Sequence, residues 1–246
     1  MDASVIKLKS MPANRISLGG IALIVAAIAV LVAILMSLAS PSKPLFSQEL
    51  ENAPNAEQLQ VALEAATFAY RFRLAMAPVF IAFLIPGTFA LYAYLSRTKQ
   101  EKLAFAGMVV TVLFLALFLP IIGFAAYVFP AIGELVAQGQ TEMIAVTDQT
   151  SLEPFIIIPF LGGILWYIGL ALMGAAVWRS GVLWKWGGLL LIINGVLSIP
   201  AFVLDIRVLN DLAGIVGGIG LIGLGISLFR SVRRTKSLEL AGAAGR

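Results

Sequence analysis

Residues 208–234 read VLNDLAGIVGGIGLIGLGISLFRSVRR, and this stretch decides between two fold classes. Within it, GIGLIG at 218–223 matches G-x-G-x-x-G, the phosphate-binding turn of dinucleotide-binding domains. That turn follows a strand, opens a helix and precedes an acidic residue by about 20 positions in a soluble βαβ unit. Here the motif lies inside an uncharged apolar stretch that ends in a short basic tail. The glycines therefore predict close packing between helices rather than a nucleotide site.

The composition excludes an ordinary soluble domain. Of the 246 residues, 60% are hydrophobic and 12% are charged, whereas soluble domains carry about 25% charged residues. Six long stretches contain no charged residue, and a helix needs about 20 mainly apolar residues to cross a bilayer. Because alternating strand patterns are absent, we predict an all-α polytopic membrane protein with six transmembrane helices in a compact bundle. The chain forms a single transmembrane domain over 1–246, with spans at about 17–40, 74–96, 103–130, 155–178, 187–204 and 211–230.

The distribution of charge predicts the orientation of the chain in the membrane. Segments 1–15, 97–102, 179–185 and 230–246 would share one side of a six-span arrangement, and they hold 13 of the 17 Lys and Arg residues. They hold only 3 of the 13 acids. Under the positive-inside rule this side faces the cytoplasm, so both termini, including a tail at 231–246, are expected there. The basic excess is thus a topology signal and does not indicate nucleic-acid binding.

Two segments on the opposite, outer side are longer than turns. They cover 43–73 and 134–153. Within the first, Asn55 can cap a helix, and apolar residues then follow roughly one face. We predict short amphipathic helical outer segments, the first of which runs into the second span.

The chain contains no Cys and no His. Disulfides, thiolate metal sites and iron–sulfur clusters are therefore excluded. The usual haem ligand, the commonest zinc ligand and the commonest general base are also missing. Carboxylate-only metal sites and carboxylate chemistry stay open. We assign no catalytic residue, no metal and no cofactor, and we expect a protein that is not an enzyme.

Neutral polar residues fall near the middle of the fourth and fifth spans. Trp166 and Tyr167 lie in the fourth span, while Asn194 and Ser198 lie one turn apart in the fifth. An amide in hydrocarbon needs hydrogen-bond partners. One interpretation is an interhelical hydrogen bond that fixes the packing. The other is the lining of a small cavity for a lipid or a substrate, and both stay open.

The sixth span is rich in small residues. Gly214 and Gly218 form a G-x-x-x-G pair, which lets helix backbones approach closely, and Gly217, Gly220 and Gly223 add further small positions. Packing within the chain, self-association through this helix and contact with another membrane protein subunit are the alternatives. Membrane lipids are expected partners in each case.

Charged residues at the outer helix ends are expected to gather near the outer interface. The favoured interpretation is that these residues form salt bridges that fix the helix ends. The alternative is general acid–base catalysis by paired carboxylates. The residues are Arg71, Arg73, Glu134, Asp205, Arg207 and Asp211.

Residues 178–197 read WRSGVLWKWGGLLLIINGVL and contain the pattern W-R-S/T-x-x-L-x-x-W-x-G. This stretch resembles the cytoplasmic hairpin of uncharacterised bacterial six-helix integral membrane proteins of the domain-of-unknown-function 4386 type. The resemblance implies a bacterial inner or plasma membrane and no assigned activity. It carries no functional residue over to this chain.

Three function classes follow from these patterns. The leading hypothesis is a structural or accessory membrane subunit that binds a partner, because no catalytic constellation is visible and the sixth helix is suited to packing. The second is a carrier for a small neutral or apolar substrate, which would use the region of Asn194. The third is an interfacial enzyme that modifies lipids through the outer acids. The sequence does not name a substrate, a partner or an oligomeric state.

Overall fold

The computed structural model describes residues 13–39, 55–142, 153–204 and 206–244, and this part of the chain contains helices and no strand. Six of its helices are long and apolar enough to cross a membrane. The predicted all-α class and the six membrane-length helices are thereby confirmed. The helices are α1 (Ala13–Ala39), α3 (Asn55–Ala65), α4 (Phe68–Leu95), α5 (Glu101–Ala137), α6 (Glu153–Ser180), α7 (Lys185–Val203) and α8 (Arg207–Ala244), of which α3 is the short one.

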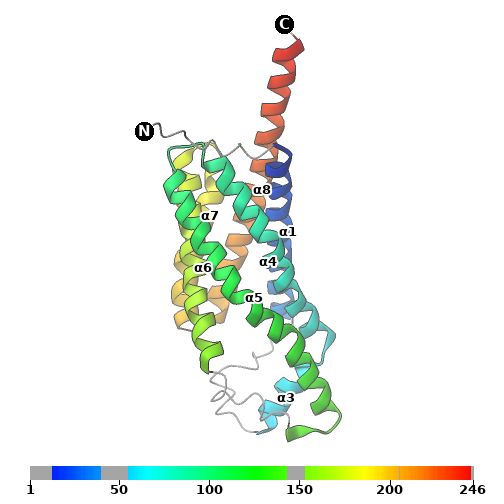
Figure 1. Ribbon diagram of the computed structural model, residues 1–246. Coiled ribbons are helices and arrows are strands. Elements are labelled where there is room, and N and C mark those ends of the chain that lie inside the picture. The colour runs from blue at the N-terminus through cyan, green and yellow to red at the C-terminus, as the bar shows by residue number, and fades with distance from the viewer. Residues whose placement is uncertain (1–12, 40–54, 143–152, 205, 245–246) are drawn as a thin grey trace, which may run out of the picture.

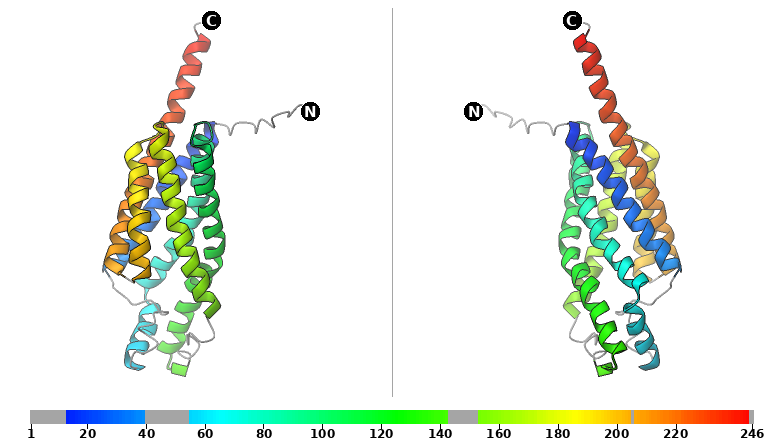
Figure 2. Two further views of the ribbon diagram at one scale, coloured as in Figure 1. Left: turned by 90° about the vertical axis from the view of Figure 1, so that its left-hand side faces the viewer. Right: turned by 90° about the vertical axis from the view of Figure 1, so that its right-hand side faces the viewer.

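The six long helices alternate in direction and form a ring of neighbours (Figures 1 and 2). Helix α1 packs against α4, each following long helix packs against the next, and α8 closes the ring against α1. The start of α1 and the last turns of α8 lie toward one end of the ring, which we call the terminal end. Helix α3 lies beyond the opposite end, which we call the α3 end, where it packs on the last turns of α5.

Glycines lie at most of the contacts between neighbouring helices. At the α1–α8 contact, a Cβ on Gly20 would lie 2.8 Å from the carbonyl oxygen of Gly225. At the α6–α7 contact, a Cβ on Gly174 would lie 2.5 Å from the carbonyl oxygen of Gly188. Such positions tolerate no side chain, so the backbones approach closely and gain dispersion contacts that lipid cannot supply as well. Helix packing in this ring therefore depends on glycine more than on large apolar side chains.

The outer helix differs from the prediction that it runs into the second span. The helix breaks after Ala65, and α4 begins at Phe68. Thr67 explains the break, because its side-chain oxygen accepts a hydrogen bond from the Tyr70 N–H at 3.3 Å and so caps a new helix. Helix α3 then packs back on α5, where a Cβ on Gly133 would lie 2.6 Å from the carbonyl oxygen of Ala62.

Two helices extend well beyond the expected spans. Helix α5 reaches Ala137, and α8 continues to Ala244 through most of the segment expected as a tail (Figure 1). Sequence hydropathy marks the part of a helix that suits hydrocarbon, whereas helix propensity favours continuation through residues such as Ala, Leu, Glu and Lys. The residues 40–54 and 143–152 of the two predicted outer segments lie outside the described part of the chain.

A pair of glycine substitutions tests the role of backbone contact. We expect Gly188→Ala to lower the free energy of unfolding by about 1–3 kcal/mol, because its Cβ would lie 2.6 Å from the Gly174 carbonyl oxygen. The control is Gly123→Ala in α5, where an added Cβ meets nothing within 4 Å. Helix propensity alone should make the control more stable by up to about 1 kcal/mol. Thermal unfolding of both variants in the same detergent measures their stability. Equal changes in stability would contradict a role for backbone contact at Gly188.

Candidate functional site

A cavity of about 170 Å³ lies inside the ring, toward the α3 end. We call it the polar cavity after the hydrogen-bonding groups on one of its walls, although most of its lining is apolar. Its walls come from α1, α4, α6, α7 and α8. The sequence patterns divided the lining residues into three separate groups: mid-depth polar residues, packing glycines and outer charges. The structure brings members of all three together, namely Trp166, Tyr167, Asn194 and Ser198, then Gly214, Gly217 and Gly218, and Asp211 with its neighbour Asn210.

Asn194 and Ser198 form the most buried polar wall of the cavity. The Ser198 hydroxyl donates to Asn194 Oδ1 at 3.0 Å, and the two residues are only 1% and 5% exposed, respectively. Within the described residues, this is the single hydrogen bond of the Asn194 side chain, so its two amide N–H groups have no protein acceptor. An amide buried in this way retains unused donor capacity that a bound molecule or water can satisfy.

Gly217 of α8 makes room for that amide. A Cβ at this position would collide with Asn194 Nδ2. The glycine therefore allows α7 and α8 to pack closely while the polar end of Asn194 lies between them. On α8, positions 210, 211, 214, 217, 218 and 221 share one face by helical spacing, and all of them line the cavity.

Tyr167 connects α6 to the first turn of α8. Its hydroxyl donates to Asn210 Oδ1 at 3.0 Å. Its ring meets Phe202 of α7 edge-on, with the ring centroids 6.2 Å apart. The tyrosine is thus held from two sides, and its hydroxyl presents remaining acceptor capacity at the cavity wall.

Asp211 is the charged member of the lining. Its Oδ2 atom is buried and has no hydrogen-bond partner among the described residues. Arg207 and Arg73 are the charged groups that act on this carboxylate electrostatically. The sequence grouped Asp211 with the outer charges, whereas the structure places it beside the polar residues of the inner wall. The i, i+3, i+7 spacing of Asp211, Gly214 and Gly218 is the signal that could have found this placement.

The opposite wall is aromatic and aliphatic. The Trp166 indole meets Phe80 of α4 edge-on at a centroid distance of 5.5 Å and Phe114 of α5 at 5.2 Å. Leu170 and Leu221 complete this wall. The sequence pattern identified Trp166 but neither Phe80 nor Phe114. Apolar residues occur on all faces of each span, so the sequence does not show which of them face the interior of the ring.

The remaining outer charges differ in their direct contacts, although Arg73 and Arg207 both act on Asp211. Arg71 of α4 pairs with Glu134 of α5, and Arg73 lies over the Tyr70 ring at 5.0 Å from its centroid. Arg207 donates to the Ser37 hydroxyl at 2.7 Å and so connects α8 to α1. The described members therefore make separate contacts that fasten helix ends. Asp205 lies outside the described residues.

The glycines singled out in the sixth span each lie against another part of the same chain. Gly214 and Gly218 face Ile34 and Leu31 of α1, respectively. Gly220 faces α7, and a Cβ on Gly223 would collide with the Trp184 ring. Together with Gly217, these positions hold α8 between α1 and α7. The GIGLIG sequence lies within the helix and forms no loop that could surround a phosphate.

The lining combines hydrogen-bonding groups on one wall with aromatic and aliphatic surface on the other. This is the usual pattern of a site for a small organic molecule. Among the described residues, no group of three or more His, Cys, Asp or Glu side chains gathers where a metal ion could be held. The arrangement is therefore suited to binding through hydrogen bonds and apolar contact.

Comparison of the chain with protein-family models, with curated proteins and with solved structures finds no match. The resemblance of residues 178–197 to six-helix membrane proteins stays a prediction.

Removing one hydroxyl tests the polar connection between α6 and α8. We expect Tyr167→Phe to lower the free energy of unfolding by about 0.6 kcal/mol, and by less than about 2 kcal/mol, as for other hydrogen bonds between membrane helices. Tyr127→Phe in α5 is the matched control, because Tyr127 is 82% exposed. Thermal unfolding in detergent compares the two variants. A control that loses as much stability as the Tyr167 variant would argue against the Asn210 hydrogen bond.

Proposed function

We propose that the protein crosses a lipid bilayer six times through the ring of long helices, with both termini in the cytoplasm. Large apolar side chains such as Leu18, Leu35 and Val196 are 64%, 62% and 60% exposed, and lipid would cover them. The described cations Arg97, Lys99, Lys102, Arg179, Lys185 and Arg230 belong to the terminal end, as expected for a cytoplasmic side.

The absence of native cysteine allows a clean test of this orientation. Gln138→Cys places a thiol at the α3 end, and Lys99→Cys places one at the terminal end, both at exposed positions. A maleimide that does not cross membranes should label Gln138→Cys in intact cells and Lys99→Cys only after lysis. The parent protein, without a thiol, gives the background. The reverse pattern, or labelling of both variants in intact cells, would overturn the orientation.

Within that membrane placement, we propose that the protein is a non-enzymatic carrier for a small neutral solute with hydroxyl or amide groups and a short apolar part. The observation that carries the proposal is the cavity inside the ring, where the Asn194 amide of α7 has N–H groups without a protein acceptor among the described residues. A solute with a hydroxyl or carbonyl oxygen would satisfy those groups. Without such a partner, a buried amide costs free energy.

The size of the cavity limits the solute. An engineered apolar cavity of about 150 Å³ holds benzene, and the cavity here measures about 170 Å³. A solute of similar size could place its polar end on Asn194, Ser198 and Tyr167. Its apolar end would then contact Trp166 and Phe80.

A carrier also needs helices that can shift, and the contact between α4 and α5 suits that requirement. Among the described residues, no glycine lies at the contact between α4 and α5. Each of the other five pairs of neighbouring long helices has a close contact at a glycine. Helix α4 contains Pro78 and Pro86, and α5 contains Pro120 and Pro130. Each proline removes a backbone hydrogen bond and permits a bend. These two helices are the best candidates for the moving part.

The other two hypotheses receive less support. The glycines that favoured an accessory subunit pack against α1, α7 and Trp184 of the same chain, so these glycines present no unmatched face to a partner. An interfacial enzyme would need its acids together, whereas Glu134 pairs with Arg71 and Asp211 lines the cavity. Both roles stay predictions from the sequence.

Solute entry into proteoliposomes tests the carrier. Stopped-flow light scattering follows the swelling that accompanies entry of glycerol, acetamide or propanediol. We expect swelling with at least one of these probes to be faster with the protein than in protein-free liposomes. Asn194→Leu should return the rate to the protein-free value, because it removes the buried donors.

The control for this experiment is Thr111→Val. Thr111 is 1% exposed and lies at the α5–α6 contact, away from the cavity, so the variant removes a buried hydroxyl without changing the lining. It should keep the parent rate. Carrier function is excluded if none of the three probes enters faster with the protein, and the role of Asn194 is excluded if both variants slow entry equally.

A further inference from the structure

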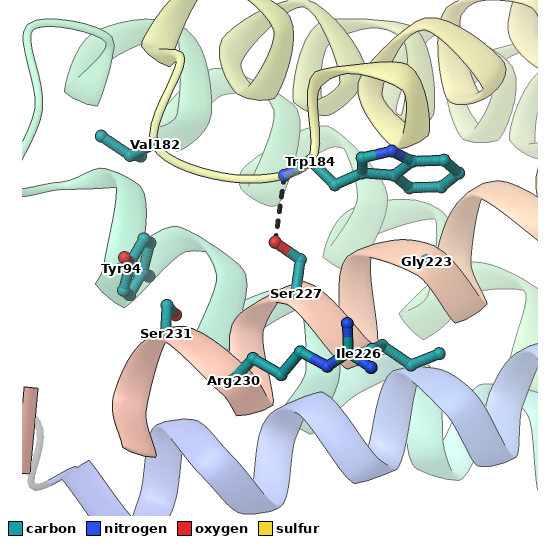
Figure 3. A pocket seen from close by; sticks show the side chains of 8 residues that line it. All are labelled: Tyr94, Val182, Trp184, Gly223, Ile226, Ser227, Arg230 and Ser231. Atoms are coloured by element: carbon teal, nitrogen blue, oxygen red, sulfur yellow. Dashed lines mark hydrogen bonds between the residues drawn. The ribbon is translucent and has the colours of Figure 1, made fainter. Parts of the chain in front are cut away.

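A second pocket, of about 660 Å³, lies at the terminal end of the ring (Figure 3). It is formed by α8, by Tyr94 near the end of α4 and by the turn between α6 and α7. It shares no lining residue with the polar cavity. Neither the carrier proposal nor the packing of the ring assigns it a role.

Gly223 and Ser227 of α8 shape this pocket. The Trp184 ring lies over Gly223, where a Cβ would collide with it. The backbone N–H of Trp184 donates to Ser227 Oγ at 3.0 Å (Figure 3). These two contacts fasten the turn between α6 and α7 to α8 and so form one wall of the pocket.

Arg230 supplies the charge of the pocket. It is exposed, and no acidic side chain among the described residues lies within salt-bridge distance of it. The guanidinium reaches along α8 toward Ile226, as Figure 3 shows. The Ser227 hydroxyl accepts from Trp184 and still has its own proton to donate. A guanidinium and a hydroxyl donor thus line the same pocket, and both groups bind the oxygens of a phosphate group.

Apolar surface adjoins these donors. Val182 and Ile226 line the pocket together with the Trp184 ring. An inorganic anion would use only the charged part of such a site. A phospholipid would use both parts, with its phosphate on Arg230 and Ser227 and the first carbons of its acyl chains on the apolar wall.

We propose that this pocket binds the phosphate headgroup of an anionic phospholipid from the cytoplasmic leaflet. The inference rests on the membrane orientation proposed above and not on the carrier function. Charge complementarity supports it, because Lys185 begins α7 directly after the same turn and the sequence of α8 continues with Arg233, Arg234 and Lys236. The cytoplasmic leaflet carries the anionic lipids that such basic segments attract.

Native mass spectrometry of the full-length protein tests the site. The protein is released from nanodiscs that contain equal amounts of phosphatidylglycerol and phosphatidylcholine with identical acyl chains. We expect the parent protein to retain about fivefold more phosphatidylglycerol than phosphatidylcholine. This ratio corresponds to the attraction of one basic residue for an anionic headgroup. Arg230→Gln should abolish this preference. Arg179→Gln, an exposed residue outside the pocket, is the matched control and should keep it.

Two further arms separate lipid binding in the pocket from general charge attraction and from binding of free phosphate. Ile226→Trp fills the pocket without changing the charge and should lower retention of phosphatidylglycerol as strongly as Arg230→Gln does. An excess of inorganic phosphate should leave the retained lipid in place. The proposal is overturned if the parent shows no preference, if Arg179→Gln abolishes it too, if Ile226→Trp keeps it or if phosphate displaces the lipid. Solute entry plays no part in this readout, so the carrier proposal can fail independently.

Discussion

The close approach of helix backbones at glycine is the constraint on which the structure depends. Gly20 and Gly225 bring α1 against α8, and Gly174 and Gly188 bring α6 against α7. In hydrocarbon there is little hydrophobic gain from moving a leucine from lipid to protein, so association relies on dispersion and on short distances. The ring can close only because side chains are missing at these positions. The same missing side chain at Gly217 leaves space for an amide inside the ring.

The polar cavity lies inside the ring that these glycine contacts close, and five of its six long helices line it. Helices α7 and α8 contribute the amide, hydroxyl and carboxylate groups, while α4 and α5 meet the Trp166 indole with aromatic rings. A polar group inside a membrane protein costs free energy unless it is paired. Ser198 pairs with one side of Asn194, and the other side has no acceptor among the described residues. The N–H groups of this amide are therefore the part that a bound molecule or water can still pair.

The sequence predicted the helices well because hydrocarbon thickness requires long uncharged stretches. It also predicted that Asn194 and Ser198 would lie together, since four residues separate them along one helix. It did not place Asp211 in the cavity or identify Phe114 beside Trp166. Those features depend on the rotation of each helix about its own axis, which packing sets and which nearly uniform hydropathy around a helix does not reveal. The cap at Thr67 was missed because apolar periodicity continues across the break and hides it.

Helix α8 runs from Arg207 to Ala244 without a proline. Asp211 near its start and Arg230 further along are separated by about 28 Å at the usual rise of 1.5 Å per residue. One continuous helix thus carries a wall of the inner cavity, a wall of the pocket at the terminal end and a projection beyond the ring. Because the projection and the cavity wall belong to the same helix, a tilt or rotation of the projection would also shift Asp211 in the polar cavity.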